Sequence, residues 1–239
     1  MNNAKSTVKD QLISELWLPS SKILGEAKAP RLKKNKNFKF FTLTTGLDYN
    51  DIICLIKSNI SKFDKITAWT SSSNNKIRVE TSLKVKVYNQ ENYEDADLNS
   101  HDIRNLFPFD IINLDYVSQG NWDSSDKLRK VVCNCQETIK LQKAKNSDMF
   151  LLILTIPLED EPIQKDVFLD LMHGGSSFTS YFDFPDTIVD KNNKASFLEE
   201  ILTQLFLKNM YVIFKTERKL IEQPMSVFSI SIIAEVMRN

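Results

Sequence analysis

An apolar segment that ends in a carboxylate constrains the fold of this chain more than any other feature. It spans Phe109–Tyr116, reads FDIINLDY, and lies near the middle of 239 residues. A short apolar run of this length is typical of a buried β-strand. Because strand and helix patterns alternate on either side, the segment predicts a mostly parallel, Rossmann-like α/β sheet with helices on both faces and a functional site at one edge.

The flanking segments support that architecture. Residues 150–156 are apolar throughout, as in a central parallel strand that is covered on both faces. We expect helices at residues 6–17, ended by Pro19, and at 124–143 and 195–209, and further strands at 38–45, 65–70, 85–87, 211–220 and 226–236. The last two strands form a hairpin that closes the chain.

Composition limits the classes of function. Lys and Arg together number 31 and equal Asp and Glu, so the chain has no excess of positive charge with which to coat nucleic acid. The three cysteines and two histidines lack the spacing of a metal site or a disulfide framework. Without a signal region or an apolar run of roughly 20 residues, the chain is expected to be cytoplasmic and not inserted in a membrane.

A parallel sheet that ends in an antiparallel strand pair resembles the class I S-adenosylmethionine-dependent methyltransferase family, in a divergent form with degraded cofactor motifs. The resemblance takes Phe109–Tyr116 as the fourth strand and residues 150–156 as the fifth. It implies an N-terminal helical arm with a basic connector, residues 1–35, followed by a methyltransferase-like domain, residues 36–239. An aromatic-rich insertion occupies residues 158–194 of that domain.

The resemblance also implies where a cofactor and an acceptor would bind. Gly46 would lie beside the methionine part of S-adenosylmethionine and Thr70 near its ribose, while Asp115 and Tyr116 would hold the methyl acceptor. The turn after the first strand has one glycine where the family usually has two or three, and no carboxylate ends the second strand. A structural alternative is that Asp115 caps a turn and Tyr116 packs under a loop.

Two further segments are candidates for recognition. The basic connector would bind nucleic acid through Arg31, Lys33, Lys34 and Lys36, or is simply a solvated linker. The insertion would bind a protein partner through aromatic side chains, or these side chains fold back over the sheet. The partner-binding candidates are Phe178, Tyr181, Phe182 and Phe184.

Three functions remain open at this stage. The favoured hypothesis is a non-catalytic, methyltransferase-like binding or assembly subunit of a multi-protein complex, in a microbial defence-type system directed at nucleic acid. In that case no cofactor is expected. The alternatives are an active S-adenosylmethionine-dependent methyltransferase, with nucleic acid as one substrate class, and a nucleic-acid-binding accessory factor without chemistry of its own.

Overall fold

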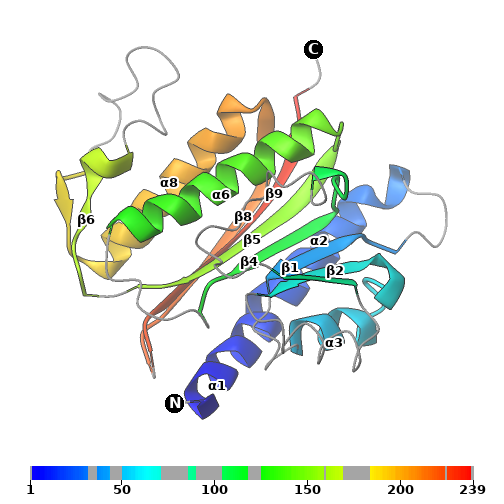
Figure 1. The fold of residues 1–239 in the computed structure, drawn as a ribbon, viewed down its shortest axis with the longest axis horizontal. Coiled ribbons are helices and arrows are strands. Elements are labelled where there is room, and N and C mark those ends of the chain that lie inside the picture. The colour runs from blue at the N-terminus through cyan, green and yellow to red at the C-terminus, as the bar shows by residue number, and fades with distance from the viewer. Residues whose placement is uncertain are drawn as a thin grey trace.

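A seven-stranded sheet forms the centre of the molecule in the computed structural model (Figure 1). The structure describes residues 2–31, 37–43, 50–70, 86–89, 104–117, 125–158, 160–168, 184–223 and 225–237. The strands are β1 (Phe40–Leu43), β2 (Ile66–Thr70), β3 (Lys86–Asn89), β4 (Ile111–Asp115), β5 (Met149–Pro157), β8 (Tyr211–Ile221) and β9 (Val227–Val236).

The strand order is β3-β2-β1-β4-β5-β9-β8. Strands β1 to β5 pair in parallel, whereas β9 runs antiparallel to both β5 and β8. The predicted fold class is therefore confirmed, including the antiparallel strand inserted beside the fifth parallel strand. The order reverses between β1 and β4, so the topological switch point of the sheet lies between their carboxyl ends.

Helices cover both faces of the sheet (Figure 1). Helices α6 (Ser125–Ala144) and α8 (Lys191–Lys208) pack on one face, and the N-terminal helices together with α3 (Asn50–Lys57) pack on the other. In β5 the even residues from Phe150 to Ile156 face α6 and α8, while Met149, Leu151 and Ile153 face the N-terminal helices. This two-sided burial explains why the segment is apolar without interruption.

The N-terminal helix does not end at Pro19 as predicted. It continues from α1 (Asn2–Leu12) through a π-helical turn (Ile13–Trp17) into α2 (Leu18–Lys28), which a short 3₁₀ turn (Ala29–Arg31) follows. A proline normally breaks a helix because it lacks an N–H and its ring meets the carbonyl four residues earlier. Here that carbonyl belongs to Glu15, inside the wider π-turn, so the helix passes the proline.

Helix α8 begins four residues earlier than expected. Asp190 is its N-cap, and its carboxylate accepts a hydrogen bond of 2.9 Å from the Asn193 N–H. On α6, Cys135 is buried in the core and Cys133 is half-buried against the same core cluster. Burial raises the pKa of the Cys135 thiol.

The two carboxylates of the octapeptide lie at opposite ends of β4. Asp110 precedes the strand, where it pairs with Lys28 of α2 and accepts a hydrogen bond of 2.8 Å from the Lys39 N–H. It therefore fixes the entry to β4, as its position before the strand predicts. Asp115 is the last residue of β4 and lies at the carboxyl end of the sheet.

Candidate functional site

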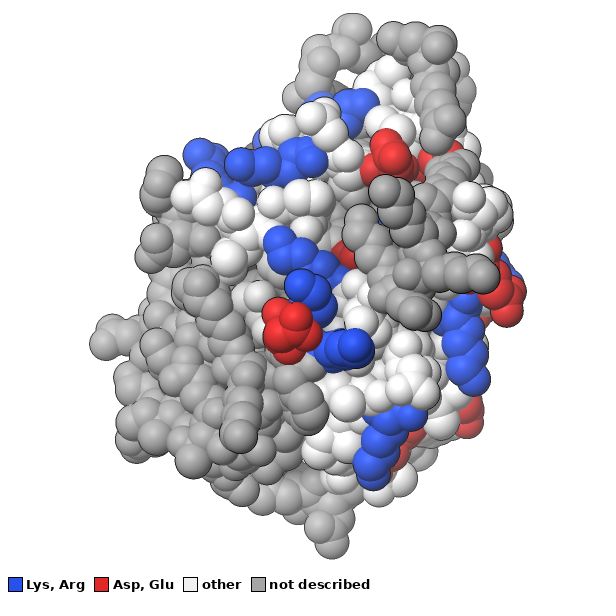
Figure 2. Space-filling view, turned by 90° about the vertical axis from the view of Figure 1, so that its right-hand side faces the viewer, with Lys and Arg blue, Asp and Glu red and all other residues white. Residues whose placement is uncertain are grey.

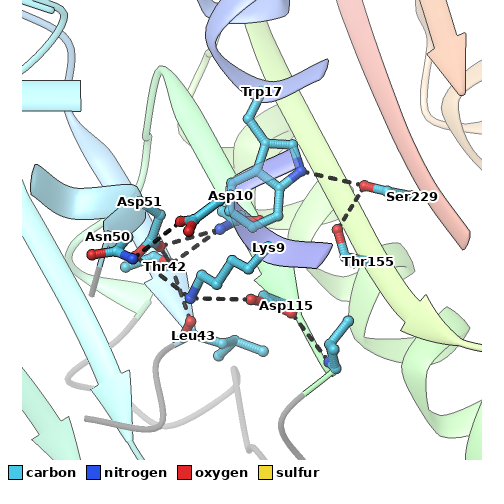
Figure 3. A network of polar contacts seen from close by, with 12 residues as sticks. Lys9, Asp10, Trp17, Thr42, Leu43, Asn50, Asp51, Asp115, Thr155 and Ser229 are labelled. Atoms are coloured by element: carbon cyan, nitrogen blue, oxygen red, sulfur yellow. Dashed lines mark hydrogen bonds and ion pairs between the residues drawn. The ribbon is translucent and has the colours of Figure 1, made fainter. Parts of the chain in front are cut away.

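The carboxyl ends of β1 and β4 carry a buried cluster of polar side chains (Figure 3). Thr42 belongs to β1, Asn113 and Asp115 to β4, and Asp51 to the first turn of α3. All four side chains are buried. Open parallel sheets bind ligands outside the carboxyl ends of their strands at the switch point, so this cluster occupies the place where the fold supports a site.

A lysine of the N-terminal helix lies between the two carboxylates. Lys9 Nζ is 3.3 Å from Asp115 Oδ2 and 3.7 Å from Asp51 Oδ1. Its side chain is 11% exposed, against 1% for Asp51 and 4% for Asp115, so water screens these ion pairs little. Figure 3 shows the Lys9 side chain reaching from α1 toward the sheet, with its ammonium group directed at both acids.

Hydrogen bonds hold other atoms of the cluster, whereas Asp51 Oδ1 and Asn113 Oδ1 accept none. Thr42 Oγ1 donates to Asp51 Oδ2 at 2.8 Å, and Asn113 Nδ2 lies 3.4 Å from the same oxygen. The Val117 N–H donates to Asp115 Oδ1 at 3.1 Å. Asp115 therefore has one carboxylate oxygen on the turn after β4 and the other on Lys9.

Burial decides the electrostatics of this cluster. It raises the pKa of Asp115, while the Lys9 ammonium and the Val117 N–H act in the opposite direction and the nearby Asp51 carboxylate adds to the rise. A buried carboxylate pair requires a cation, and Lys9 supplies it. The N-terminal helix thus compensates charge that the sheet alone would leave unpaired.

A row of polar contacts attaches the same helix to the sheet beyond the switch point. Asn50 donates to Asp10 at 3.1 Å, and the Trp17 indole N–H donates to Ser229 Oγ at 3.3 Å (Figure 3). Ser20 and Ser231 share a hydrogen bond of 2.7 Å. These contacts surround the apolar packing of α1 and α2, and they fix the position of Lys9.

The structure separates the two residues that the resemblance placed at the acceptor. Asp115 faces α1, but Tyr116 is buried on the opposite face of the sheet, where its hydroxyl accepts a hydrogen bond of 3.1 Å from Asn134 of α6. The contact of Asp115 with the Val117 N–H is a turn cap, as in the structural alternative, whereas the Tyr116 hydroxyl is hydrogen-bonded to α6 and not to a loop. A direct role for either residue in chemistry stays a prediction.

Most of the other candidates are outside the described residues. These are Gly46, Lys33, Lys34, Lys36, Phe178, Tyr181 and Phe182. Thr70 ends β2 and Arg31 ends the 3₁₀ turn after α2. Phe184 is half-buried, and its ring contacts Phe197 of α8 with a centroid distance of 5.5 Å, next to the buried Phe168.

The surface gives no single basic stripe on the side that Figure 2 displays. There, the described Lys and Arg side chains are scattered among uncharged and acidic ones. Within the described ranges, no group of three or more His, Cys, Asp or Glu side chains is arranged to hold a metal ion. In the same part of the chain, no helix is both long and apolar enough to cross a membrane.

Sequence reasoning missed Lys9, Thr42 and Asp51. Asp51 carried a weak signal, because an acidic residue in the first turn of a helix after β1 lies near the switch point by topology. Lys9 carried none, since its contact with Asp115 is set by the docking of a helix that is remote in sequence.

The strand order and the antiparallel β9 define the class of this protein: it has a divergent class I, Rossmann-like methyltransferase-type fold. No protein-family model matches the chain, and no curated protein matches it either.

Comparison with solved structures finds similar chains of low sequence identity. A SAM-dependent methyltransferase from Methanosarcina mazei is 13% identical, with 86% of this chain and 95% of that chain covered and a TM-score of 0.44. Magnesium protoporphyrin IX methyltransferase from Synechocystis PCC 6803, solved with bound SAH, is 9% identical over 92% of this chain and 83% of its own, with a TM-score of 0.45. The 16S rRNA (adenine(1408)-N(1))-methyltransferase from Catenulisporales acidiphilia is 12% identical, with coverages of 92% and 93% and a TM-score of 0.43.

Proposed function

We propose that this protein is a non-catalytic binding or assembly subunit that keeps the methyltransferase-type fold but fills its switch point with its own Lys9. The observation that carries the proposal is the position of the Lys9 ammonium between Asp51 and Asp115. A side chain of the same molecule has an effective concentration that a dissolved ligand rarely matches. Both carboxylates are therefore already paired with the one Lys9 ammonium when a cofactor arrives.

The described residues at the switch point do not fit S-adenosylmethionine. Its sulfonium and its amino group both carry positive charge, so whichever of them bound beside the Lys9 ammonium would be repelled at a buried position where screening is poor, although Lys9 would attract its carboxylate. Both carboxylate oxygens of Asp115 already have a partner, the Lys9 ammonium and the Val117 N–H, with which a cofactor hydroxyl would compete. The strand β2 ends at Thr70, a neutral residue where the family resemblance implies an acid.

Calorimetric titration with S-adenosylmethionine and S-adenosylhomocysteine tests the proposal. We expect no heat of binding at millimolar ligand from the folded wild-type protein. The matched variant is Gly46→Trp, in which the bulky side chain blocks the turn where the methionine part would lie. Micromolar binding by the wild type that Gly46→Trp abolishes would overturn the proposal and make the search for a methyl acceptor the next step.

An active methyltransferase is the second candidate, and the position of Asp115 favours it. The residue ends β4 at the switch point and is buried, as an acceptor-binding acid would be. In that case displacement of Lys9 must accompany cofactor binding. Intrinsic fluorescence of Trp17, whose indole is hydrogen-bonded to Ser229 beside the same helix, would then change with added cofactor.

The assembly role includes a protein partner at the aromatic insertion and a cellular role directed at nucleic acid. The protein partner is supported by aromatic side chains that remain candidates for contact, namely Phe178, Tyr181 and Phe182. A nucleic-acid accessory role would be identified by a different experiment. The affinity for DNA or RNA would have to fall as the salt concentration rises, and binding would have to disappear when Lys33, Lys34 and Lys36 are changed to alanine.

A further inference from the structure

The strand β8 forms one edge of the seven-stranded sheet. It is 11 residues long, Tyr211–Ile221, and pairs with β9 on its inner side. Among the residues that the structure describes, no strand pairs with its outer side. A long edge of this kind presents a row of backbone donors and acceptors that can pair with another strand.

Exposed apolar side chains gather at one end of this edge. Val212 is 49% exposed and Phe214 is 56% exposed, and both lie in a β-strand whose other apolar residues are covered. Phe214 points outward because it is the extra residue at the irregularity between Ile213 and Lys215. A shallow hollow of about 610 Å³ lies there, lined by Val212, Ile213, Phe214, Glu235, Val236 and Met237. An apolar surface beside an open edge indicates a contact with another chain.

The charges of β8 identify the partner. Lys215 and Glu217 lie on the same face of the sheet, opposite Ile233 and Ser231 of β9, and their side chains are 2.8 Å apart. Thr216 lies between them. In an antiparallel pair of two β8 strands with a two-fold axis at Thr216, each Lys215 faces the Glu217 of the other copy. The strand is therefore complementary in charge to itself.

We propose that a second copy of this chain docks on β8, so that the two sheets join edge to edge in antiparallel pairing about Thr216. The two Lys215–Glu217 pairs then form between the copies as well as within them. In this register Phe214 lies opposite Arg218 of the other copy, so the ring of Phe214 contacts a cationic side chain across the pair. The proposal concerns a different surface from the switch point, so the outcome of the cofactor titration does not bear on it.

Sedimentation velocity over a range of protein concentrations tests the dimer. We expect a reversible monomer–dimer equilibrium in the wild type. In Lys215→Glu, two attractive cross-strand pairs become repulsive, which raises the dissociation constant about tenfold. The double variant Lys215→Glu with Glu217→Lys restores both pairs with reversed polarity, and the wild-type constant should return.

Two controls make the test specific. Lys57→Glu makes the same charge change on the exposed end of α3, at the other side of the sheet, and should leave the equilibrium unchanged. Phe214→Ser removes an exposed ring and should weaken the dimer while the circular dichroism of the monomer stays the same. A protein that remains monomeric at all concentrations, or a dimer that Lys215→Glu does not weaken, would overturn the proposal.

Discussion

Lys9 illustrates how one side chain can determine the properties of a buried site. Asp51, in the first turn of α3, and Asp115, at the end of β4, meet at the carboxyl end of the sheet, and each would be costly to bury alone. The ammonium group of α1 makes that arrangement possible. The charge of Lys9 and the apolar packing of the neighbouring Val8 and Leu12 therefore hold the helix to the sheet together.

Replacing Lys9 should lower the free energy of unfolding more than replacing an average surface lysine does. In Lys9→Met the apolar stem is kept but the charge is lost, leaving two buried carboxylates without a cation. We expect the free energy of unfolding to fall by about 3 kcal/mol at pH 7, as when one partner of a buried ion pair is removed. Urea denaturation of the variant and the wild type measures this change in the free energy of unfolding. Lys22→Met, on the exposed side of α2, is the matched control and should change the stability by less than about 0.5 kcal/mol. Equal effects of the two substitutions would mean that the ion pairs contribute nothing.

The pKa of Asp115 gives a pH dependence of known sign. Because burial raises this pKa in the folded chain, folding binds a proton between the ordinary value of 3.8 and the raised one. The contribution of Asp115 to stability is fully present below pH 3.8 and is lost as the pH rises through the folded value.

Asp115→Asn should therefore gain stability relative to the wild type as the pH is raised from about 4 to 7. Unfolding in urea at several pH values measures the difference. Asp126→Asn, at an exposed position of α6, should show no such trend. A constant difference between Asp115→Asn and the wild type across this range would contradict the pKa shift.

At the scale of elements, local sequence signals decided where the helices and strands lie but not always where they end. The strand 150–156 and the helix 124–143 were predicted within a residue or two, because one is apolar without a break and the other repeats its apolar residues at helical spacing. The continuation past Pro19 was not predictable. It depends on a π-turn whose buried residues Ile13, Leu16 and Trp17 are held by the sheet, which is a tertiary effect.

The start of α8 was predictable in principle. Asp190 precedes the helix, and an aspartate at that position is a common N-cap. The earlier expectation of residue 195 followed the apolar periodicity alone and overlooked the cap. Periodicity marks the buried part of a helix, whereas the cap marks its beginning.

The capping contact of Asp190 is open to a direct test. Asp190→Ala removes the acceptor of the Asn193 N–H and should lower the free energy of unfolding by about 1 kcal/mol. Asp190→Ser keeps an acceptor and should recover most of that loss, as measured by thermal and urea unfolding. If serine and alanine destabilise the protein equally, the hydrogen bond is not the cause.

At the scale of the whole molecule, topology was more predictable than the site. The order of strands was implied by the family resemblance, which rested on the alternation of patterns and on the final hairpin. The site depends on which side chain of a distant helix reaches the switch point, and no local pattern records that. The N-terminal residues are part of the hydrophobic core. Residues 2–31 form α1, the π-turn, α2 and the 3₁₀ turn, and they contribute Val8, Leu12, Leu16 and Leu24 to the core beneath β1, β4 and β5.

Removing residues 1–31 should therefore unfold or aggregate the chain. The truncation exposes the apolar face of the sheet that carries Phe40, Ile111 and Leu151, and it leaves Asp51 and Asp115 without Lys9. Burial of such a face contributes roughly 25 cal/mol for each Å² of apolar surface, a large part of the marginal stability of a domain.

We expect loss of the soluble, cooperatively unfolding species in size-exclusion chromatography and thermal unfolding. Adding residues 1–36 as a separate peptide should restore part of it, and the same peptide with Lys9→Met should restore less. A truncated chain that stays soluble and unfolds cooperatively at the wild-type temperature would instead make these helices a separable arm.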